Sequence, residues 1–413
     1  MTDASELSLA DFLFCDSDDP LVPSADFLEW RKAGAWATSL YEPHLFGPPV
    51  PRVEIERAGV RRKVINLSSY NYMGFAAHPE VIKAAQDALA KYGTGACGSP
   101  LLSGLSDLHV RLEEQVSRFM GRESTMLFNS GFGGAMGALA GMLRKGDAAI
   151  VDEKSHLSLV AGANVSRCKL HFFKHNDPAS LDEVLARTEG RRRIVVVEGI
   201  YSMDGDMADL PALIEVSEKH KVGIFIDEAH SILAWGKSGR GVAEYHGVED
   251  RVGLIFATFS KAFAGAGGFV TGKKATIDYL RFYSNAYGFS CALPPSVVAG
   301  LLKALEIVQS DSSIRQKLMD NTVYFHEQLK GMGLNLGDST TQVIPIIIGS
   351  DRKLLYELCH EMNDKGLFLA PVDYPSVPED GLRYRVAVTA AHTREDLDEA
   401  LQIIKDTIVK RTR

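Results

Sequence analysis

The sequence has few of the residues that would build a disulfide-stapled or zinc-bound fold. Among 413 residues only five are cysteines, an odd number without any CxxC spacing: Cys15, Cys97, Cys168, Cys291 and Cys359. This usage argues against a disulfide framework or a structural zinc site, and it fits a reducing compartment. We therefore expect no metal and a cytoplasmic location.

The chain also lacks an excess of positive charge and any long apolar run. Its net charge is -8 and its sequence pI is about 5.9, which argues against nucleic acid or an anionic membrane as the main partner. We find no signal peptide and no stretch apolar enough to span a bilayer. Hydrophobic residues make up 46% and charged residues 24%, as in ordinary globular proteins.

Three zones follow one another along the chain. Residues 1–60 have no regular pattern and contain "FGPPVPR", whose prolines disfavour helices and strands. We interpret this zone as an N-terminal arm that packs on the main body or on a partner subunit. Residues 61–300 form a large domain and residues 301–413 a small one, as expected for a chain of this length.

The large zone alternates between short apolar runs and helical patterns. The runs "TMLFNSG", "AAIVDE", "RIVVVEGI", "VGIFIDEAH", "VGLIFATFS" and "GGFVTG" are typical of buried strands, and helical spacing separates several of them. This alternation predicts an α/β fold with a mostly parallel sheet covered by helices. In the small zone, "VIPIII", "LFLAPV" and "LRYRVAV" predict strands beside two helices, which indicates an α+β domain.

Polar residues follow the predicted strands where an open parallel sheet carries its chemistry. Asn129, Ser130 and Gly131 lead into a helix whose free N–H groups suit a phosphate, although such turns are common. His156 follows the next strand and is either a structural hydrogen bonder or a ligand. Asp227 ends a later strand and is either a helix cap or a functional carboxylate.

Lys261 stands between an apolar strand and the run "AFAGAGGF" without an acidic neighbour in sequence. Most lysines lie at the surface with a snorkelling ammonium group. A desolvated lysine amine is instead suited to Schiff-base chemistry. The order of phosphate-binding turn, histidine, strand-end aspartate and lysine favours the second interpretation. Pyridoxal phosphate needs a helix N-terminus for its phosphate, an amine for its aldehyde and a carboxylate for its ring nitrogen.

Eight segments in order resemble the α-oxoamine synthases, which are pyridoxal-phosphate enzymes of fold type I. They are "LSSYNYMGF", "GTGACGSPLLSG", "LFNSGFGGAMG", "DEKSHLSL", "EGIYSMDGDMADL", "FIDEAHSILAWGKSGRG", "ATFSKAFAGAGGFVTG" and "LRYRVAVTAAHT". The resemblance covers the chain from about residue 60 to its C-terminus. It implies a fold type I transferase with a large, mostly parallel sheet domain and a smaller C-terminal α+β domain.

The resemblance also implies the cofactor and the role of each matching residue. Lys261 would bind pyridoxal phosphate as a Schiff base and move the α-proton of the substrate. Asp227 would pair with the ring nitrogen, His230 would bind the phenolic oxygen, and His156 would stack on the ring. Further implied cofactor contacts are Ser130, Gly131, Phe132, Ser202, Thr258 and, from a partner subunit, Ser290. Implied substrate contacts are Tyr70, Asn71, Ser376 and Arg385.

Two of these implied contacts have alternative interpretations. Arg385 matches the carboxylate-binding arginine of the family, but it could also be a surface arginine on its strand. Ser290, in "GFSCALPP", could pack within its own chain instead of reaching a partner's phosphate. The family pattern implies a homodimer with shared active sites.

The implied reaction is a decarboxylative Claisen condensation of a small amino acid with an acyl thioester. It yields an α-aminoketone, carbon dioxide and a free thiol, and the acyl carrier could be coenzyme A or a carrier protein. Residues 70–74, "YNYMG", are closer to serine palmitoyltransferase than to biotin-type members. Pro100 and Leu101 stand where many members have a basic residue. Glycine, alanine and serine therefore all stay open as substrates. The apolar "SPLL" and the aromatic N-terminal arm predict an acyl chain longer than succinyl.

Two alternatives belong to other functional classes. Another fold type I reaction, an aldolase or aminotransferase, would share the cofactor but need no acyl thioester. A non-catalytic partner subunit would typically lack the lysine, and Lys261 is present.

Overall fold

The computed structural model describes residues 7–13, 17–33 and 40–412. The chain divides into two compact units. Unit 1 comprises Met1–Ser69, Met203–Gly205 and Leu318–Arg413, and unit 2 comprises Tyr70–Ser202 and Asp206–Lys317. The zones predicted from the sequence, with boundaries near residues 60 and 300, do not coincide with these ends. Strand β3 (Val60–Asn66) pairs with β12 (Leu367–Phe368) inside unit 1. Helix α12 (Pro295–Ser310) packs on α3 (Pro79–Tyr92) and α4 (Asp107–Met120) inside unit 2.

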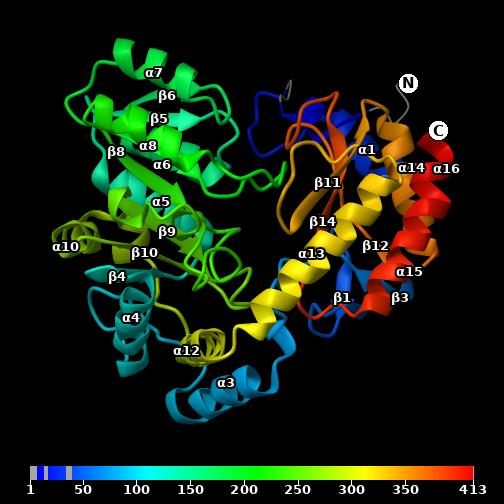
Figure 1. The fold of residues 1–413 in the computed structure, drawn as a ribbon, viewed down its shortest axis with the longest axis horizontal. Helices are drawn as coiled ribbons and strands as arrows, with labels where there is room; N and C mark the ends of the chain where they lie inside the picture. Colours follow the sequence, from blue (N-terminus) through cyan, green and yellow to red (C-terminus); the bar gives the residue numbers. More distant parts are fainter. Residues whose placement is uncertain (1–6, 14–16, 34–39, 413) are drawn as a thin grey trace. The chain divides into compact units, whose positions relative to one another are not determined.

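Unit 2 is built around a seven-stranded sheet of order β4-β10-β9-β8-β7-β5-β6 (Figure 1). Its strands are β4 (Ser124–Phe128), β5 (Ala148–Asp152), β6 (Lys169–Phe173), β7 (Arg193–Glu198), β8 (Gly223–Asp227), β9 (Leu254–Thr258) and β10 (Gly268–Gly272). All neighbours pair in parallel except β10, which is antiparallel to both β4 and β9. The predicted α/β fold with a mostly parallel sheet is confirmed.

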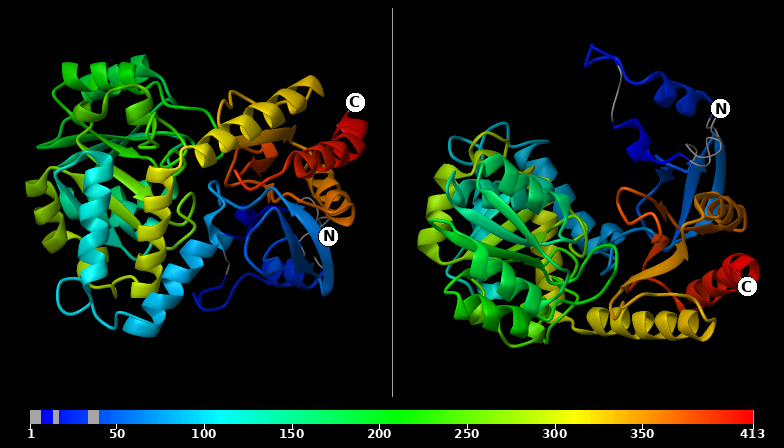
Figure 2. Two further views of the ribbon diagram at one scale, coloured as in Figure 1. Left: turned by 60° about the horizontal axis from the view of Figure 1, so that its bottom comes forward. Right: turned by 90° about the horizontal axis from the view of Figure 1, so that it is seen from above.

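Burial explains why these short apolar runs form strands. Every residue of β5, β9 and β10 is buried, so both faces of the sheet are covered. Figures 1 and 2 show the sheet enclosed by helices of the same unit. The described helices of unit 2 are η2 (Phe75–Ala77), α3 (Pro79–Tyr92), α4 (Asp107–Met120), α5 (Gly131–Met142), α6 (Leu157–Ser166), α7 (Pro178–Arg187), α8 (Leu210–Lys219), α9 (Val242–Tyr245), η3 (Glu249–Arg251), α10 (Lys274–Tyr283), α11 (Asn285–Gly288) and α12 (Pro295–Ser310).

Unit 1 contains two smaller sheets, of order β1-β2-β3-β12 and β11-β14-β13. Their strands are β1 (His44–Phe46), β2 (Arg52–Arg57), β3 (Val60–Asn66), β11 (Val343–Gly349), β12 (Leu367–Phe368), β13 (Pro371–Val372) and β14 (Leu382–Ala387). The helices are η1 (Leu9–Phe12), α1 (Ala25–Ala33), α13 (Ser313–Gly331), whose first residues belong to unit 2, α14 (Arg352–Asp364), α15 (Arg394–Ile404), η4 (Lys405–Val409) and α16 (Lys410–Thr412). The α+β character predicted for the small domain is present here.

The expectation that residues 1–60 lack regular structure was wrong. β2 pairs with β3 in an antiparallel hairpin, and β3 pairs in parallel with β12. The sequence "RVEIER" alternates between apolar and charged residues, and Val53 and Ile55 are buried while their neighbours are not. This two-residue period is typical of a half-buried strand. The prolines at positions 48, 49 and 51 lie between β1 and β2 and interrupt neither strand.

Among the described residues, no helix has both the length and the apolarity needed to cross a bilayer.

Candidate active site

Unit 2 contains a cavity of about 450 Å³ at the carboxyl ends of its parallel strands. Nine of the residues predicted from the sequence line it: Ser130, Gly131, Phe132, His156, Ser202, Asp227, His230, Thr258 and Lys261. Carboxyl ends of parallel strands meet at one edge of a sheet, so strand-end residues far apart in sequence come together there. The structure thus gathers these residues in one place.

Asp227 and Lys261 form the charged centre of the cavity. Asp227 is the last residue of β8, and burial raises its pKa to about 6, although Lys261 and the Ala229 N–H group act to lower it. The Ala229 N–H donates to Oδ1 of Asp227 over 2.8 Å. Burial lowers the pKa of Lys261, while the negative charges of Asp227 and Glu198 partly oppose that shift. Lys261 is therefore the desolvated amine that the second interpretation of the sequence required.

His230 is held by a tyrosine that the sequence analysis did not assign to the cofactor site. Its Nδ1 lies 2.8 Å from the hydroxyl oxygen of Tyr72, and both residues are buried. Burial, with smaller contributions from Lys261 and His156, holds the pKa of His230 well below its usual value. His230 is therefore a neutral imidazole whose orientation is set by Tyr72. Tyr72 belongs to the "YNYMG" segment, which the sequence analysis had already singled out. Its polar hydroxyl group was the signal that could have identified it.

His156 is the N-cap residue of α6. Its Nδ1 lies 2.7 Å from the hydroxyl oxygen of Ser158 and accepts from the Ser158 N–H. Burial lowers its pKa, and the charge of Lys261 lowers it further. A neutral ring that lines the cavity and is exposed suits packing against a flat aromatic group.

The N-terminus of α5 faces the same cavity. Ser130 caps this helix by accepting from the Gly133 N–H over 3.1 Å, and the first turn leaves further N–H groups without intrahelical partners. Gly131 has no room for a side chain, because an added Cβ would lie 2.5 Å from Oγ1 of Thr258. Thr258 donates to the Gly267 carbonyl over 2.9 Å. These close contacts bring two loops together around a site that suits an anion.

Glu198 was missed by the sequence analysis. It ends β7, lines the cavity, and is paired in register with Asp227 on the adjacent strand. Its carboxylate accepts the backbone N–H of His156. Burial and the neighbouring Asp227 raise its pKa well above the usual value. The signal was available, because Glu198 in "VVVEGI" follows the same strand-end rule that singled out Asp227.

Three other predicted residues of unit 2 do not line this cavity. Tyr70 packs edge-on against His230, with ring centroids 6.1 Å apart. Asn71 is buried and accepts from the Ala76 N–H over 3.2 Å, which stabilises the turn after it. Ser290 is half-buried, and the next residue, Cys291, accepts from the Asn129 side chain over 2.9 Å. The roles suggested for these residues remain predictions.

Arg385 and Ser376 belong to unit 1. Arg385 is on β14, and burial lowers its pKa to about 10, so it is not a fully exposed surface arginine. Its Nη1 lies 3.6 Å from Sδ of Met203, which is also in unit 1. Ser376 is exposed in a turn where its N–H donates to the Asp373 carbonyl over 3.0 Å. Their substrate contacts remain predictions.

Comparison with known proteins places the chain in a family. Residues 62–404 match the model of the aminotransferase class I and II family. The chain is 38% identical to 8-amino-7-oxononanoate synthase of Thermoanaerobacter pseudethanolicus over 376 residues, which cover 91% of this chain and 93% of that one. It is 36% identical to serine palmitoyltransferase of Sphingobacterium spiritivorum over 342 residues, 83% of this chain and 86% of the other. This chain belongs to the α-oxoamine synthase family.

Solved structures support the same assignment. The fold matches serine palmitoyltransferase of Sphingomonas wittichii with a TM-score of 0.87 at 32% identity, covering 92% of this chain and 96% of that one. It also matches a structure of SPT with PLP as an internal aldimine, with a TM-score of 0.88 at 29% identity, over 94% and 98% of the two chains. This α-oxoamine synthase is therefore a pyridoxal-phosphate-dependent enzyme of the acyltransferase type, with fold type I.

The residues present fit pyridoxal phosphate. The cavity of this α-oxoamine synthase offers a desolvated amine in Lys261, a buried carboxylate in Asp227 and the N-terminus of α5 for a phosphate. Amine, carboxylate and anion site are the three groups that the cofactor requires.

Proposed function

We propose that this α-oxoamine synthase condenses glycine, alanine or serine with an acyl thioester. The products are an α-aminoketone, carbon dioxide and a free thiol, which together balance the two substrates. The observation that supports this most strongly is the single cavity that brings Lys261, Asp227, His230 and His156 together.

Pyridoxal phosphate, when bound, supplies a reactive carbonyl for the substrate amine and an electron sink for charge at the α-carbon. Asp227 would hold a proton on the ring nitrogen, and Ser130, Gly131 and Thr258 would bind the phosphate. Lys261 would take the proton from the α-carbon and later return one, because its lowered pKa increases the fraction of neutral amine. His230, held by Tyr72, would bind the phenolic oxygen. These assignments combine the geometry with the family resemblance.

We propose a long acyl chain rather than a short dicarboxylic one. Pro100 and Leu101 cannot provide the positive charge that a second carboxylate would favour, and Leu102 is 87% exposed beside them. The chain is similar both to 8-amino-7-oxononanoate synthases and to a serine palmitoyltransferase, and the second similarity is compatible with a long acyl chain. Either coenzyme A or a carrier protein could present the acyl group.

The direct test is a matrix of amino acids against acyl thioesters of increasing length. Free thiol and carbon dioxide should appear in equal amounts, with the highest kcat/KM for a long-chain thioester and one of the three small amino acids. An aldolase or aminotransferase would turn over amino acids without consuming thioester. That outcome would replace the proposed reaction with the alternative one.

A second test concerns the cofactor lysine. Borohydride treatment of the wild-type holoenzyme should attach the reduced cofactor to the peptide containing Lys261, as measured by mass spectrometry. Lys261→Ala should give no such adduct, and turnover should fall by about 10³-fold or more because the general base is lost. The adduct on another lysine in the variant would contradict the assignment. Lys145→Ala, between α5 and β5, is a control that removes an exposed lysine outside the cavity lining.

We further propose a homodimer that shares its active sites, and a cytoplasmic location. Phe289 is 88% exposed and Leu102 is 87% exposed. Their segments are joined, since the Ala292 N–H donates to the Gly98 carbonyl over 2.9 Å. Apolar side chains exposed together favour an interface. The four described cysteines are free thiols, which is compatible with a reducing compartment.

A further inference from the structure

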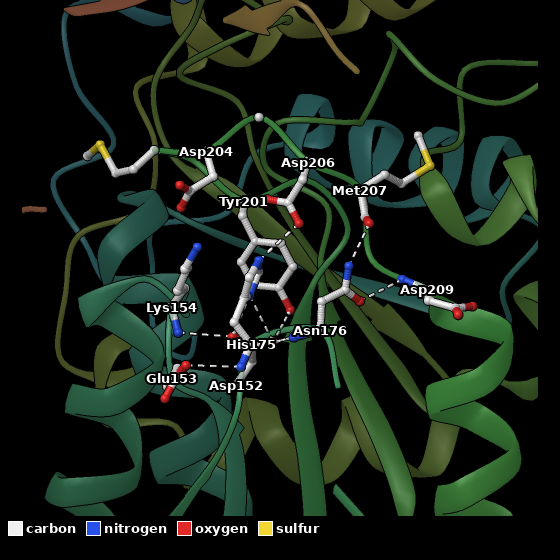
Figure 3. A network of polar contacts seen from close by, with 12 residues as sticks. Asp152, Glu153, Lys154, His175, Asn176, Tyr201, Asp204, Asp206, Met207 and Asp209 are labelled. Carbon is white, nitrogen blue, oxygen red and sulfur yellow. Dashed lines mark hydrogen bonds and ion pairs between the residues drawn. The ribbon is translucent and has the colours of Figure 1, made fainter. Parts of the chain in front are cut away.

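A buried ion network lies beside the cavity, around His175, which stands two residues after the end of β6 (Figure 3). Nδ1 of His175 lies 3.0 Å from Asp152, and Nε2 lies 3.0 Å from Asp206. A neutral imidazole has one N–H donor, whereas an imidazolium has two. Because a carboxylate faces each ring nitrogen, the protonated ring fits this position.

The ring is also enclosed by groups from two loops. Tyr201 packs edge-on against it, with centroids 4.3 Å apart, and donates its hydroxyl to Asp152 over 2.8 Å. Glu153 accepts the backbone N–H of His175 over 3.1 Å, and Lys154 is on the same turn. The charged and titratable groups around His175 are thus Asp152, Glu153 and Lys154 from the β5–α6 turn and Tyr201 and Asp206 from the segment after β7. Burial disfavours the charged ring, but the bonds to Asp152 and Asp206 outweigh it and raise the pKa of His175 to about 9.

Both of these loops carry residues that line the cavity. Asp152 ends β5 and accepts the Lys154 N–H over 2.9 Å, and its carbonyl accepts the Ser155 N–H over 2.9 Å. The next residue, His156, is at the cavity wall. Tyr201 is followed directly by Ser202, which also lines the cavity. The network therefore stabilises the two turns that carry the cavity-lining residues His156 and Ser202.

Asn176 extends the same support to the chain after Asp206. Its N–H donates to Asp152 over 2.8 Å, and its side chain donates to the Met207 carbonyl over 3.0 Å. Its side-chain oxygen accepts from the Asp209 N–H over 2.8 Å. His175 and Asn176 together fasten the segment after β7 to the end of β5.

We propose that His175 is a positioning residue for the cofactor cavity, because its bridge between Asp152 and Asp206 holds the turns that carry His156 and Ser202. The proposal rests on the proposed roles of those two residues. His175 is outside the cavity lining, so it acts on the cofactor only through the loops. It takes no part in proton transfer to the substrate.

The test compares His175→Gln with His220→Gln in the full-length protein. His220 also pairs with an aspartate, Asp182, at 2.5 Å, but that pair joins α7 to the end of α8 and does not line the cavity. We expect His175→Gln to weaken binding of pyridoxal phosphate to the apoprotein about 10-fold, as outer-shell residues do at metal sites. The visible circular dichroism of the bound cofactor should also decrease. His220→Gln should retain the affinity and spectrum of the wild type.

A purely structural role makes a different prediction. His175→Gln would then lower Tm but keep wild-type cofactor affinity and spectrum, and this result would overturn the proposal. If His175→Gln yields no folded protein, Asp206→Asn is judged by the same two measurements. If His175→Gln and Asp206→Asn both fold, the double variant should lose less affinity for pyridoxal phosphate than the sum of the two single losses. Each substitution alone already breaks the bridge between His175 and Asp206. Full additivity would also contradict the proposal.

These measurements are independent of the condensation reaction, because they use no amino acid or thioester. Failure of the wild-type protein to bind pyridoxal phosphate would contradict the proposed function itself. Normal cofactor binding with unchanged variants would contradict only the role of His175.

Discussion

The chemistry of this protein depends on how burial changes a few individual residues. Asp227 and Glu198 lie side by side at the ends of β8 and β7, and burial raises the pKa of both. Two adjacent buried carboxylates do not ionise together easily. Lys261 favours the ionised form of each, so the negative charge that Asp227 would offer to the ring nitrogen depends on this lysine as well.

Asp227→Asn tests this electrostatic role. The variant should still bind pyridoxal phosphate, because the amide keeps the shape of the carboxyl group. Its kcat should fall by about 10²–10³-fold, since an amide cannot hold a proton on the ring nitrogen. Asp177→Asn is the matched control, because Asp177 caps α7 and asparagine also serves as an N-cap. Steady-state kinetics with near-normal kcat for Asp227→Asn would contradict the assignment.

Among the helices, close packing of α5 on α6 positions the N-terminus of α5, which we propose binds the phosphate. Gly162 of α6 has no space for a side chain, because an added Cβ would lie 2.7 Å from the Met136 carbonyl oxygen and 2.9 Å from Cβ of Leu139. Both neighbours are on α5, and one of them is backbone that cannot rotate away. The position of α5, and with it Ser130 at its N-terminus, therefore depends on this glycine.

Gly162→Ala should lower the free energy of unfolding by about 1–3 kcal/mol, as overpacking typically does. Alanine gains up to about 1 kcal/mol over glycine in a helix, but it does not remove the clash. Gly223→Ala is the control, since nothing lies within 4 Å of its added Cβ. Thermal unfolding of both variants measures the difference. Equal Tm values for the two variants would show that α5 and α6 can move apart at little cost.

At the scale of the whole molecule, stability should depend on pH through His175. Its pKa is raised from about 6.5 in the unfolded chain to about 9 in the folded one. The folded state therefore binds the proton more tightly. The resulting stabilisation is complete below about pH 6.5 and is lost as pH rises towards 9.

The Tm of the wild-type apoprotein should therefore decrease more steeply between pH 7 and 9.5 than the Tm of His175→Gln. Scanning calorimetry of both proteins across this range measures the effect. Parallel curves for the wild type and His175→Gln would mean that His175 is not protonated in the folded protein.

Assembly is the other property of the whole molecule, and it can be tested by mixing two inactive variants. Lys261→Ala and Ser290→Asp each damage one proposed part of the site. If Ser290 acts across a dimer interface, one site of a mixed dimer contains both wild-type residues, so activity should partly recover. Light scattering should first show a dimer, and differently tagged subunits should show exchange. No recovery after verified exchange would leave Ser290 as a residue of its own chain.

The fold class and most of the cavity-lining residues could be predicted from the amino-acid order alone. Runs such as "AAIVD" are too continuously apolar for a half-exposed strand, so they predict a sheet covered on both faces. The rule that parallel strands place their carboxyl ends together then identified Ser130, His156, Asp227 and Lys261. Local patterns sufficed because each of these residues ends a strand or stands within about four residues after one.

Contacts between residues that are distant in sequence became visible only in the tertiary structure. The contact of Tyr72 with His230 and the bridge from His175 to Asp152 and Asp206 join segments without any shared local pattern. The pairing of β3 with β12, more than 300 residues later, likewise places the start of the chain in unit 1. Such contacts depend on long-range packing and on burial, which also shifts the pKa values of the site. Neither can be read from the spacing of residues along the chain.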